Sequence, residues 1–399
     1  MLLDLSKPDG PGFLINDFKP RISVLKIAVN TRLLLPGKLE GIGWFAYQSL
    51  KRIVRSHPEA DFHFLFDRPY SNEFIFAPNV NPVRLFPPAR HPFLYYCYFE
   101  QSITRYLDKT SPDLFLSPDG FLSTRYRGKQ LPVFHDLNFM HFPHFLPLLT
   151  RKYYLHYFPK YAGKAYRIAT VSEYSKTDIA RTFSYPEEKV DVVYNGVNQG
   201  FAPVSESVAR ATRQEFTSGR PYFVYIGSLH KRKNIVNMLR AFDAFRKDDH
   251  EQHKLLIIGA PMFGSGDIRK AFASMVHKND VLIIGRQYGE VLCRLVGSAR
   301  ALLLVSHFEG FGSPIIEAMQ SEVPVITSDV ASMPEVAGDA ALFASPGSID
   351  QIVDAMRRIV SDDKLREELI RKGRQQRLRF SWDKTSERLW HSMEKCISG

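Results

Sequence analysis

Two glutamates eight positions apart, Glu309 and Glu317, enclose a glycine-rich turn and a proline. The apolar run 301–305 before them predicts a buried parallel strand, and Pro314 suits the first position of a helix, where its missing N–H needs no partner. The sequence therefore places Glu309 in a strand-to-helix loop and Glu317 in the first turn of the helix. Free amides at such a helix start bind anions, and the flanking carboxylates can accept hydrogen bonds from sugar hydroxyls. The segment predicts a site for a ligand that carries both phosphate and sugar.

A second loop carries consecutive cations. Gly227 and Ser228 follow a predicted strand, and Arg232 and Lys233 precede a predicted helix at 235–246. A planar guanidinium and a compact ammonium both suit phosphate oxygens. The alternative is a solvated basic turn. We favour a diphosphate clamp, because the glycine turn and the acidic loop two strands later point to one combined site.

The charges of the two loops predict which part of the ligand each loop would bind. A carboxylate beside a diphosphate would be repelled, so we expect Glu317 on a ribose diol and Glu309 against a second sugar. Arg232 and Lys233 would hold the phosphates. The alternative for the glutamates is helix capping, since acids in a first helical turn are favourable through the helix dipole alone.

His135 and Asp136 end the predicted strand 131–134, which places the imidazole at the edge of the expected cleft. His141 and His144 follow, but the spacing H-x5-H-x2-H fits no common zinc pattern. The sequence contains no Asp-x-Asp, so no divalent metal is expected. We interpret His135 as a hydrogen-bonding group at the reacting sugar or phosphate, with a core or helix-capping histidine as the alternative.

Gly41 and Gly43 lie in a predicted loop before a helix that runs from Trp44 to about Arg55. They form only a fragment of the dinucleotide fingerprint, because Ala46 stands where a third glycine would be. An NAD site is therefore not expected. A glycine loop that admits a phosphate or an acceptor is the preferred interpretation.

Length, cysteines and charge restrict the class of protein. The 399 residues are enough for two domains with full-sized cores, and three widely separated cysteines favour a reducing compartment over a disulfide framework. No apolar stretch approaches 18 residues and the start lacks a signal-peptide pattern, so a cytoplasmic protein is expected. The net charge of +11 divides into +7 for residues 1–200 and +4 for the rest. This excess fits an anionic substrate, an acidic membrane surface or nucleic acid.

Apolar runs alternate with helical stretches twice along the chain, which predicts an α/β protein with two doubly wound, Rossmann-like domains that face each other across a cleft. Residues 1–23 are expected to form an irregular extension, and the domain boundary falls near 200. The basic, aromatic segment 151–167 predicts a partly buried amphipathic helix, or a helix on a membrane surface. The predicted strands are 24–29, 62–66, 114–116, 131–134 and 167–172 in the first half, and 222–226, 254–258, 281–284, 301–305 and 324–326 in the second.

Together these segments resemble the retaining glycosyltransferases of family four, also called group 1, which have the GT-B fold. The resemblance implies transfer of a hexose from a nucleotide-diphosphate sugar, in UDP or GDP form, without metal or other cofactor and with retained anomeric configuration. It implies an acceptor domain at 24–200, a donor domain at 201–380 and a final helix, 381–399, that packs back on the first domain. The segments that carry the resemblance, in chain order, are 41–43, 134–136, 169–175, 195–197, 227–234, 309–317 and 333–339.

Residue by residue, the resemblance implies that Arg232 and Lys233 neutralise the leaving diphosphate and that the segment around Arg286 borders the base. Family members use the leaving phosphate to help deprotonate the acceptor, so no separate base is needed. The residues implied in catalysis are His135, Arg232, Lys233 and Glu309. Those implied in donor binding are Gly41, Gly43, Gly227, Ser228, Arg286, Phe311, Gly312, Ser313 and Glu317.

The expected role is assembly of a surface polysaccharide or glycolipid, with mannose as the first candidate sugar and a glycan or glycolipid as acceptor. The basic first half could touch the inner face of a membrane. The alternatives are a nucleotide-sugar epimerase or phosphorylase on the same fold, and a basic nucleic-acid-binding protein. Nucleic acid is disfavoured as a partner, because the cations lie mostly at strand ends rather than among exposed aromatics.

Overall fold

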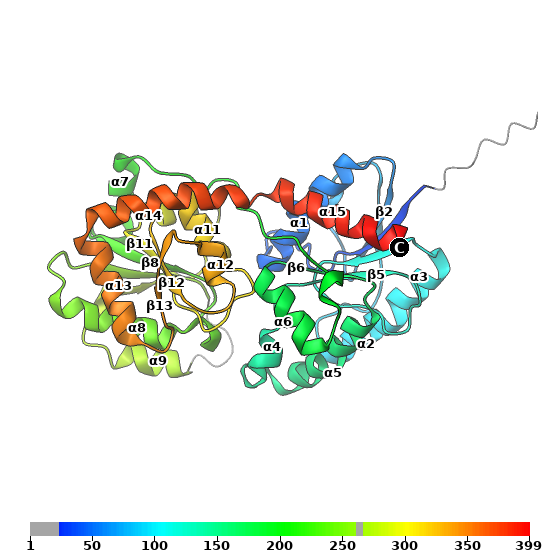
Figure 1. The fold of residues 1–399 in the computed structure, drawn as a ribbon, viewed down its shortest axis with the longest axis horizontal. Helices are drawn as coiled ribbons and strands as arrows, with labels where there is room; N and C mark the ends of the chain where they lie inside the picture. The colour runs from blue at the N-terminus through cyan, green and yellow to red at the C-terminus, as the bar shows by residue number, and fades with distance from the viewer. Residues whose placement is uncertain (1–23, 261–265) are drawn as a thin grey trace, which may run out of the picture.

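The computed structural model describes residues 24–260 and 266–399, which form two lobes, each built on one parallel sheet (Figure 1). The expected extension at residues 1–23 lies outside the described residues. The strand order is β3-β2-β1-β4-β5-β6-β7 in the first sheet and β10-β9-β8-β11-β12-β13 in the second. In both sheets the chain begins in the middle, winds to one edge, returns and winds to the other. The prediction of two Rossmann-like, doubly wound α/β domains is confirmed.

The first sheet is parallel throughout, with Ile27 paired to Phe62 of the next strand and to Leu114 on the other side. A π-helical stretch, Tyr98–Ile103, joins α2 to α3. The strands are β1 (Lys26–Asn30), β2 (Asp61–Phe66), β3 (Val80–Arg84), β4 (Leu114–Ser117), β5 (Gln130–Phe134), β6 (Ile168–Thr170) and β7 (Val190–Val192), and the helices α1 (Gly41–Ser56), α2 (Pro92–Cys97), α3 (Thr104–Thr110), α4 (Asn138–His141), α5 (Leu148–Lys164) and α6 (Glu173–Phe183).

The second sheet pairs β8 with both β9 and β11, so the order in which the strands are added to the sheet reverses between β8 and β11. Its strands are β8 (Tyr222–Ile226), β9 (Lys254–Ile258), β10 (Val281–Ile283), β11 (Ala301–Leu304), β12 (Val325–Ser328) and β13 (Ala341–Ala344). Its helices are α7 (Glu206–Thr217), α8 (Ile235–Phe245), α9 (Gly266–Ala273), α10 (Gly289–Gly297), α11 (Ser313–Gln320), α12 (Met333–Ala337), α13 (Ile349–Ser361) and α14 (Asp363–Gln376), and the last helix of the chain is α15 (Trp382–Ser398).

The expected strands are present, but β3, β7 and β13 were not predicted. All three are edge strands. An edge strand has one neighbouring strand and is partly exposed, so it can contain fewer apolar residues than a central strand. β3 even contains Pro82, which is tolerated at an edge because no ladder hydrogen bond is lost on the open side.

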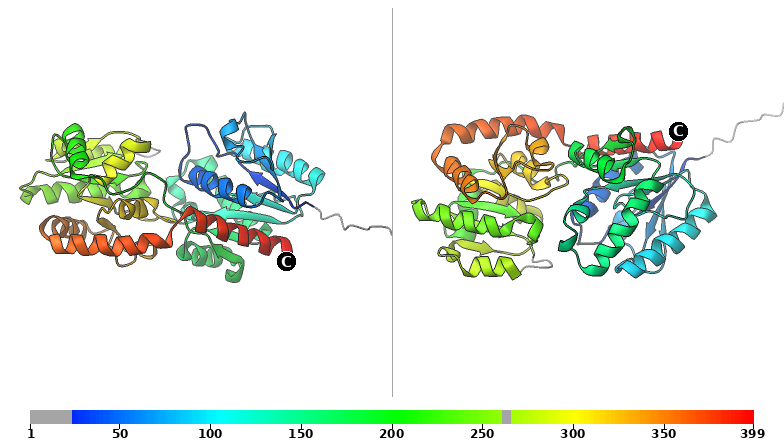
Figure 2. Two further views of the ribbon diagram at one scale, coloured as in Figure 1. Left: turned by 90° about the horizontal axis from the view of Figure 1, so that it is seen from above. Right: turned by 60° about the horizontal axis from the view of Figure 1, so that its bottom comes forward.

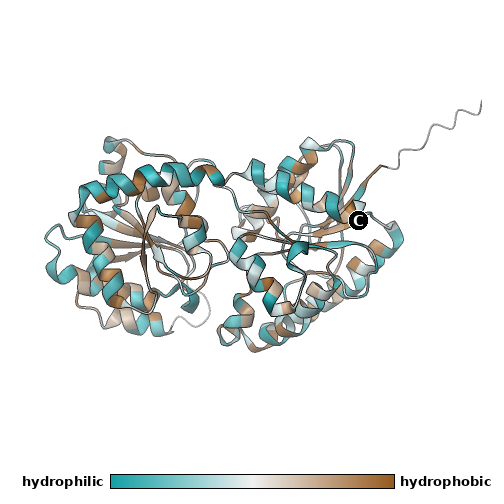
Figure 3. Ribbon diagram, in the orientation of Figure 1, coloured by the Kyte–Doolittle hydropathy of each residue, from teal (hydrophilic) through white to brown (hydrophobic). Residues whose placement is uncertain are grey.

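Burial explains why the central strands read as continuous apolar runs. Helices cover both faces of each sheet, so strands such as β4 and β11 are buried along their whole length (Figure 3). In α5 the aromatic side chains of Tyr153, Phe158 and Tyr161 are buried, which confirms the prediction of a partly buried amphipathic helix. Among residues 24–260 and 266–399, no helix is long and apolar enough to cross a membrane.

The last helix leaves the second lobe and packs on the first. After α14, the chain crosses over and α15 lies against α1, with a 2.6 Å ion pair from Arg52 to Asp383 (Figures 1 and 2). Thr385 Oγ1 donates to the Tyr194 carbonyl at 2.7 Å. Gly196 explains the Asn-Gly pair of the sequence, because a Cβ there would lie 2.3 Å from the backbone N of Trp382. The glycine lets the returning chain cross close to the linker between the sheets.

Candidate active site

Glu309 lies at the centre of a buried ion cluster in the loop after β11. Its Oε1 accepts from Lys233 Nζ at 2.6 Å and from Ser306 Oγ at 2.6 Å, and its Oε2 accepts from Arg232 Nη1 at 2.9 Å. The side chain is 7% exposed. Burial alone would raise the pKa of Glu309, but the charges of Lys233 and Arg232 outweigh it and lower the pKa to about 2. The carboxylate is therefore ionised at every physiological pH.

The cations are held in place by a short 3-10 turn, η5 (Lys231–Lys233), between β8 and α8. The His230 side chain caps this turn by accepting from the Arg232 amide at 3.2 Å. Asn234 ends it in the left-handed conformation, with φ 58°, and donates to the carbonyls of Val305 and Pro346 at 2.9 and 2.7 Å. The loops after β8 and β11 are thus fastened together where the strand order of the sheet reverses, the usual ligand position in such folds.

In this structure Glu309, Arg232 and Lys233 form one cluster, and their expected roles towards the sugar and the phosphates stay predictions. Burial lowers the pKa of Lys233, and Glu309 offsets part of that effect. Two buried cations side by side would repel each other, so a carboxylate between them stabilises both. The cluster still has a net charge of +1, and an anion can bind to it.

Unpaired amides lie next to this cluster at the start of α11. The N–H groups of Phe311, Gly312 and Ser313 have no hydrogen-bond partner among the described residues. Gly312 adopts φ 86°, a left-handed conformation that favours glycine, and directs the chain into the helix. The Phe311 ring packs against Phe380, with centroids 5.4 Å apart, so only its backbone faces a ligand position. A loop of free amides beside a net positive cluster is suited to a phosphate group.

Glu317 lies in the second turn of α11, not the first as predicted, because the helix begins at Ser313. Its side chain is buried and has no hydrogen bond to any described residue. Burial raises the pKa of Glu317 to about 7. The thiol of Cys293, on α10, lies close to this carboxylate: burial, and after it the charge of Glu317, raises the pKa of Cys293. A buried carboxylate without a partner is costly, as expected of a group kept for a ligand.

The raised pKa of Glu317 makes stability depend on pH. In the unfolded chain this carboxyl ionises near pH 4.5, but in the folded chain only near pH 7, so stability falls as pH rises between these values. At pH 8 the loss is on the order of 3 kcal/mol. We expect Glu317→Gln to unfold at higher denaturant concentration than the wild type at pH 8 and to lose most of that advantage at pH 4.5. Urea unfolding at both pH values tests this, and a pH-independent difference would contradict it.

His135 lies at the end of β5 and is held by the first domain. Its Nε2 is 2.8 Å from the Pro118 carbonyl, which can only accept, so Nε2 carries the proton. The ring meets Phe45 of α1 edge to face, with centroids 4.9 Å apart. Burial, the largest influence, lowers the pKa of His135 and keeps the imidazole neutral. Nδ1 is then free to accept, which suits a sugar hydroxyl better than a phosphate.

The remaining predicted residues surround this centre. Gly41 and Gly43 were predicted to lie in a loop, but they form the first turn of α1. A Cβ at Gly43 would lie 3.0 Å from the Leu33 carbonyl, so glycine allows the loop to pass close to the helix. Arg286 is half exposed and pairs with Glu40 at 2.6 Å, which joins the second domain to the start of α1.

Gly227 and Ser228 form the turn after β8. Gly227 has φ 152°, in the region that favours glycine, and a Cβ at Gly259 would lie only 1.8 Å from the Gly227 carbonyl. The loops after β8 and β9 therefore touch through two glycines. The Ser228 carbonyl accepts from the Tyr225 hydroxyl at 3.0 Å, which fixes the turn beside the cations of η5.

The two domains meet at Gly310, one residue after Glu309. A Cβ there would lie 2.1 Å from the His135 carbonyl, and the Gly310 carbonyl accepts from Ser172 Oγ at 2.7 Å. Glu335 of α12 completes the contact, because its carboxylate accepts from the amides of Glu173 and Tyr174 at 2.8 and 3.0 Å. These contacts bring His135 beside the loop that carries Glu309.

Sequence reasoning missed a buried ion pair at the corresponding point of the first sheet. Arg32 Nε donates to Asp119 Oδ2 at 2.5 Å, and Asn30 Nδ2 donates to Asp119 Oδ1 at 2.7 Å. The Arg32 guanidinium lies 4.4 Å from the Phe121 ring centre. Polar residues directly after two predicted strands, 24–29 and 114–116, were the available signal. Among the described residues, no group of three His, Cys, Asp or Glu side chains could hold a metal ion.

Comparison with protein families defines the class of protein. Residues 37–201 match the model of glycosyltransferase family 4, and residues 210–376 match that of glycosyl transferases group 1. The chain therefore belongs to the group 1, family 4 glycosyltransferases, as the resemblance of the sequence predicted.

Individual relatives and solved structures agree with this assignment. O-antigen chain mannosyltransferase B of Escherichia coli is 28% identical over 271 residues, 68% of this chain and 71% of that protein. O-antigen chain mannosyltransferase RfbU of Salmonella typhimurium is 27% identical over 235 residues, 56% of this chain and 62% of that protein. Sucrose-phosphate synthase from Thermosynechococcus elongatus superposes with a TM-score of 0.75 at 18% identity, covering 94% of this chain and 99% of that chain.

A second structure shares the fold at similar coverage. Anabaena HepE, solved in complex with UDP-glucose, superposes with a TM-score of 0.72 at 15% identity and covers 93% of this chain and all of that chain. At these identities the likeness establishes the fold alone, and the fold is GT-B.

Proposed function

We propose that this protein is a retaining, metal-independent hexosyltransferase that uses a nucleotide-diphosphate sugar and adds mannose to a glycan or glycolipid acceptor during surface-polysaccharide assembly. The observation that carries the donor side is the cluster of Arg232, Lys233 and Glu309 beside the free amides that begin α11. Mannose and the polysaccharide acceptor rest on the relatives, of which two act on O-antigen chains and are mannosyltransferases.

In the proposed reaction, the bond between the anomeric carbon and the diphosphate oxygen breaks while the acceptor hydroxyl oxygen bonds to the same carbon. The acceptor proton passes to the leaving diphosphate. Arg232 and Lys233 turn from Glu309 towards the phosphate oxygens, where negative charge develops. Buried cations are effective in this role because the surrounding protein screens them less than water does.

The other side chains position the sugar and the nucleoside. Nδ1 of neutral His135 accepts from a hydroxyl of the transferred sugar, and Glu309 accepts from another. Glu317 accepts hydrogen bonds from the ribose diol, which supplies the donors that no described residue provides. Contact of the basic first domain with an anionic membrane stays a prediction.

Titration with UDP and GDP tests the donor site. One nucleotide is expected to bind with a dissociation constant below about 1 mM, and Arg232→Gln is expected to weaken that binding about tenfold or more. Screening UDP- and GDP-sugars for slow donor hydrolysis then identifies the sugar. Arg240→Gln, on the exposed side of α8, is the matched control and should bind as the wild type does. Failure of both nucleotides to bind would refute the proposal.

A further inference from the structure

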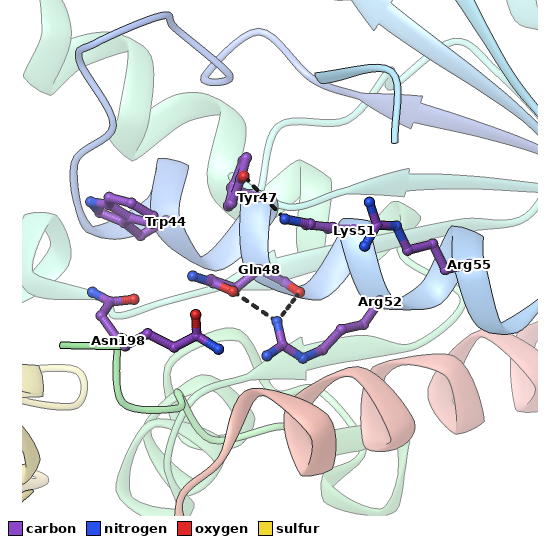
Figure 4. A pocket seen from close by; sticks show the side chains of 8 residues that line it. Trp44, Tyr47, Gln48, Lys51, Arg52, Arg55 and Asn198 are labelled. Carbon is purple, nitrogen blue, oxygen red and sulfur yellow. Dashed lines mark hydrogen bonds between the residues drawn. The ribbon is translucent and has the colours of Figure 1, made fainter. Parts of the chain in front are cut away.

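A groove lies on the first domain, along the outer side of α1 and away from the ion cluster. Its volume is about 510 Å³, within the range of ligand sites. α1 supplies most of its wall, and the linker between the two sheets supplies the rest (Figure 4). The lining side chains are Trp44, Tyr47, Gln48, Lys51, Arg52, Arg55, Asn198 and Gln199.

The groove offers hydrogen-bond donors that have no acceptor in the described part of the chain. The indole N–H of Trp44 is unpaired, and so is the amide of Gln199. Asn198 uses its oxygen to accept from Trp382 Nε1 at 3.2 Å, so its NH₂ group is free. The oxygen of Gln48 likewise accepts from Arg52 at 2.7 Å. The unpaired N–H groups of Trp44, Asn198 and Gln199 can donate to oxygen acceptors of a ligand.

The charge of the groove has one sign. Lys51, Arg52 and Arg55 line it, and no acidic side chain does so among the described residues. Arg52 is partly neutralised by Asp383 at 2.6 Å, but Lys51 has no carboxylate partner in the described part of the chain and its Nζ lies 3.5 Å from the Tyr47 hydroxyl. Among residues 24–260 and 266–399, the Arg55 guanidinium bonds only to the Phe76 carbonyl, at 3.3 Å. Two cations without a carboxylate partner favour an anionic ligand.

Two aromatic side chains complete the lining. Trp44 and Tyr47 lie edge to face with ring centroids 5.7 Å apart, and Trp44 is half-buried. An aromatic ring presents an apolar face that packs against C–H groups, while its polar edge bonds to oxygen. A sugar ring has both kinds of surface. Carbohydrate with acidic groups therefore matches the lining better than a small inorganic anion, which has no C–H groups to pack against the rings.

We propose that this groove binds an anionic glycan chain, such as the part of a charged acceptor that lies beyond the reacting sugar. Phe45, between the glycines and Tyr47 on α1, contacts His135, and Asn195 Nδ2 lies 3.5 Å from Ser313 Oγ, three residues before Asn198. Phe45 and Asn195 do not line the groove, but each is a close chain neighbour of residues that do, so the groove and the predicted donor site are supported by the same helix and linker. The role as acceptor subsite rests on the proposed function, whereas binding itself needs neither donor nor catalysis.

Calorimetric titration of the full-length protein with trigalacturonate, a carboxylated oligosaccharide, tests the proposal. We expect binding with a dissociation constant below about 1 mM in low salt, and a loss of about tenfold or more both in Trp44→Ala and in the double variant Lys51→Gln, Arg55→Gln. Uncharged maltotriose should bind about tenfold more weakly or not at all. The matched control is Arg105→Gln, Lys109→Gln on α3, which removes two cations of the same domain and should change nothing.

Three outcomes would overturn the proposal. The first is no binding of trigalacturonate to the wild type. The second is tripolyphosphate binding as tightly as trigalacturonate and an unchanged affinity in Trp44→Ala, which would describe a simple anion site. The third is loss of binding to phosphatidylglycerol vesicles, but not to trigalacturonate, in the Lys51, Arg55 variant, which would describe a membrane contact. UDP and GDP titration of the same variants distinguishes this failure from failure of the donor site, since these side chains are not part of that cluster.

Discussion

Glu309→Gln is expected to reduce sugar transfer by about 100- to 1,000-fold while nucleotide binding stays the same or becomes tighter. The amide keeps the shape of the side chain but loses its charge. Arg232 and Lys233, which now pair with the carboxylate at 2.9 and 2.6 Å, would then have no competitor for the phosphate oxygens. The transferred sugar, by contrast, would lose the carboxylate proposed to hold it. Separate measurement of transfer rate and of UDP or GDP affinity distinguishes the two effects.

The same substitution should lower the free energy of unfolding of the unliganded protein by about 3 kcal/mol, because two buried cations lose their counter-charge. Saturating nucleotide should restore part of this loss, as the diphosphate replaces the carboxylate. Ser306→Ala is the control: it removes one 2.6 Å hydrogen bond to Glu309 and keeps the charge, so transfer should fall by less than about tenfold. If Glu309→Gln loses nucleotide binding together with transfer, Glu309 only positions the cations and its proposed contact with the sugar is wrong.

Gly310→Ala is expected to reduce transfer about 100-fold with little change in nucleotide affinity. The new Cβ would lie 2.1 Å from the His135 carbonyl and 2.7 Å from Asp136 Cβ, too close for any real contact. The His135 carbonyl belongs to the backbone, and Asp136 Cβ is bonded directly to it, so neither atom can swing aside and the domains must separate at this point. His135 would move away from the donor loop, and a displacement on the order of 1 Å is enough for a loss of this size.

The control for this substitution is Gly347→Ala, in the loop before α13 of the same domain. A Cβ there meets no atom within 4 Å, so both transfer and binding should remain at the wild-type level. Small-angle scattering with bound nucleotide would report the separation of the domains. A Gly310→Ala enzyme with normal transfer would show that contact between His135 and the donor loop is not needed for the reaction.

The sequence predicted most of the architecture because central parallel strands must be apolar on both faces. β8 and β9 have the predicted bounds, and β4 and β5 differ by a single residue. The strands β3 and β7 were missed for the complementary reason, since an edge strand carries a weaker pattern, whereas β13 was missed although its four residues are all apolar. Local rules also gave the wrong position for Gly41 and Gly43, because a helix can begin on glycine, and at Gly43 the neighbouring loop packs closely against it.

By itself the sequence determined which residue types gather at the donor site and in which order along the chain. Loops at the carboxyl ends of neighbouring parallel strands converge, so Arg232, Lys233 and the 309–317 segment were recognisable without coordinates. Only the tertiary structure decided how their charges are distributed. Burial in a common interior brings Glu309 between the two cations and leaves Glu317 without a partner among the described residues. The pKa of Glu309 is lowered to about 2, and that of Glu317 is raised to about 7. Such a difference depends on distance and solvation, which a linear spacing of eight residues does not contain.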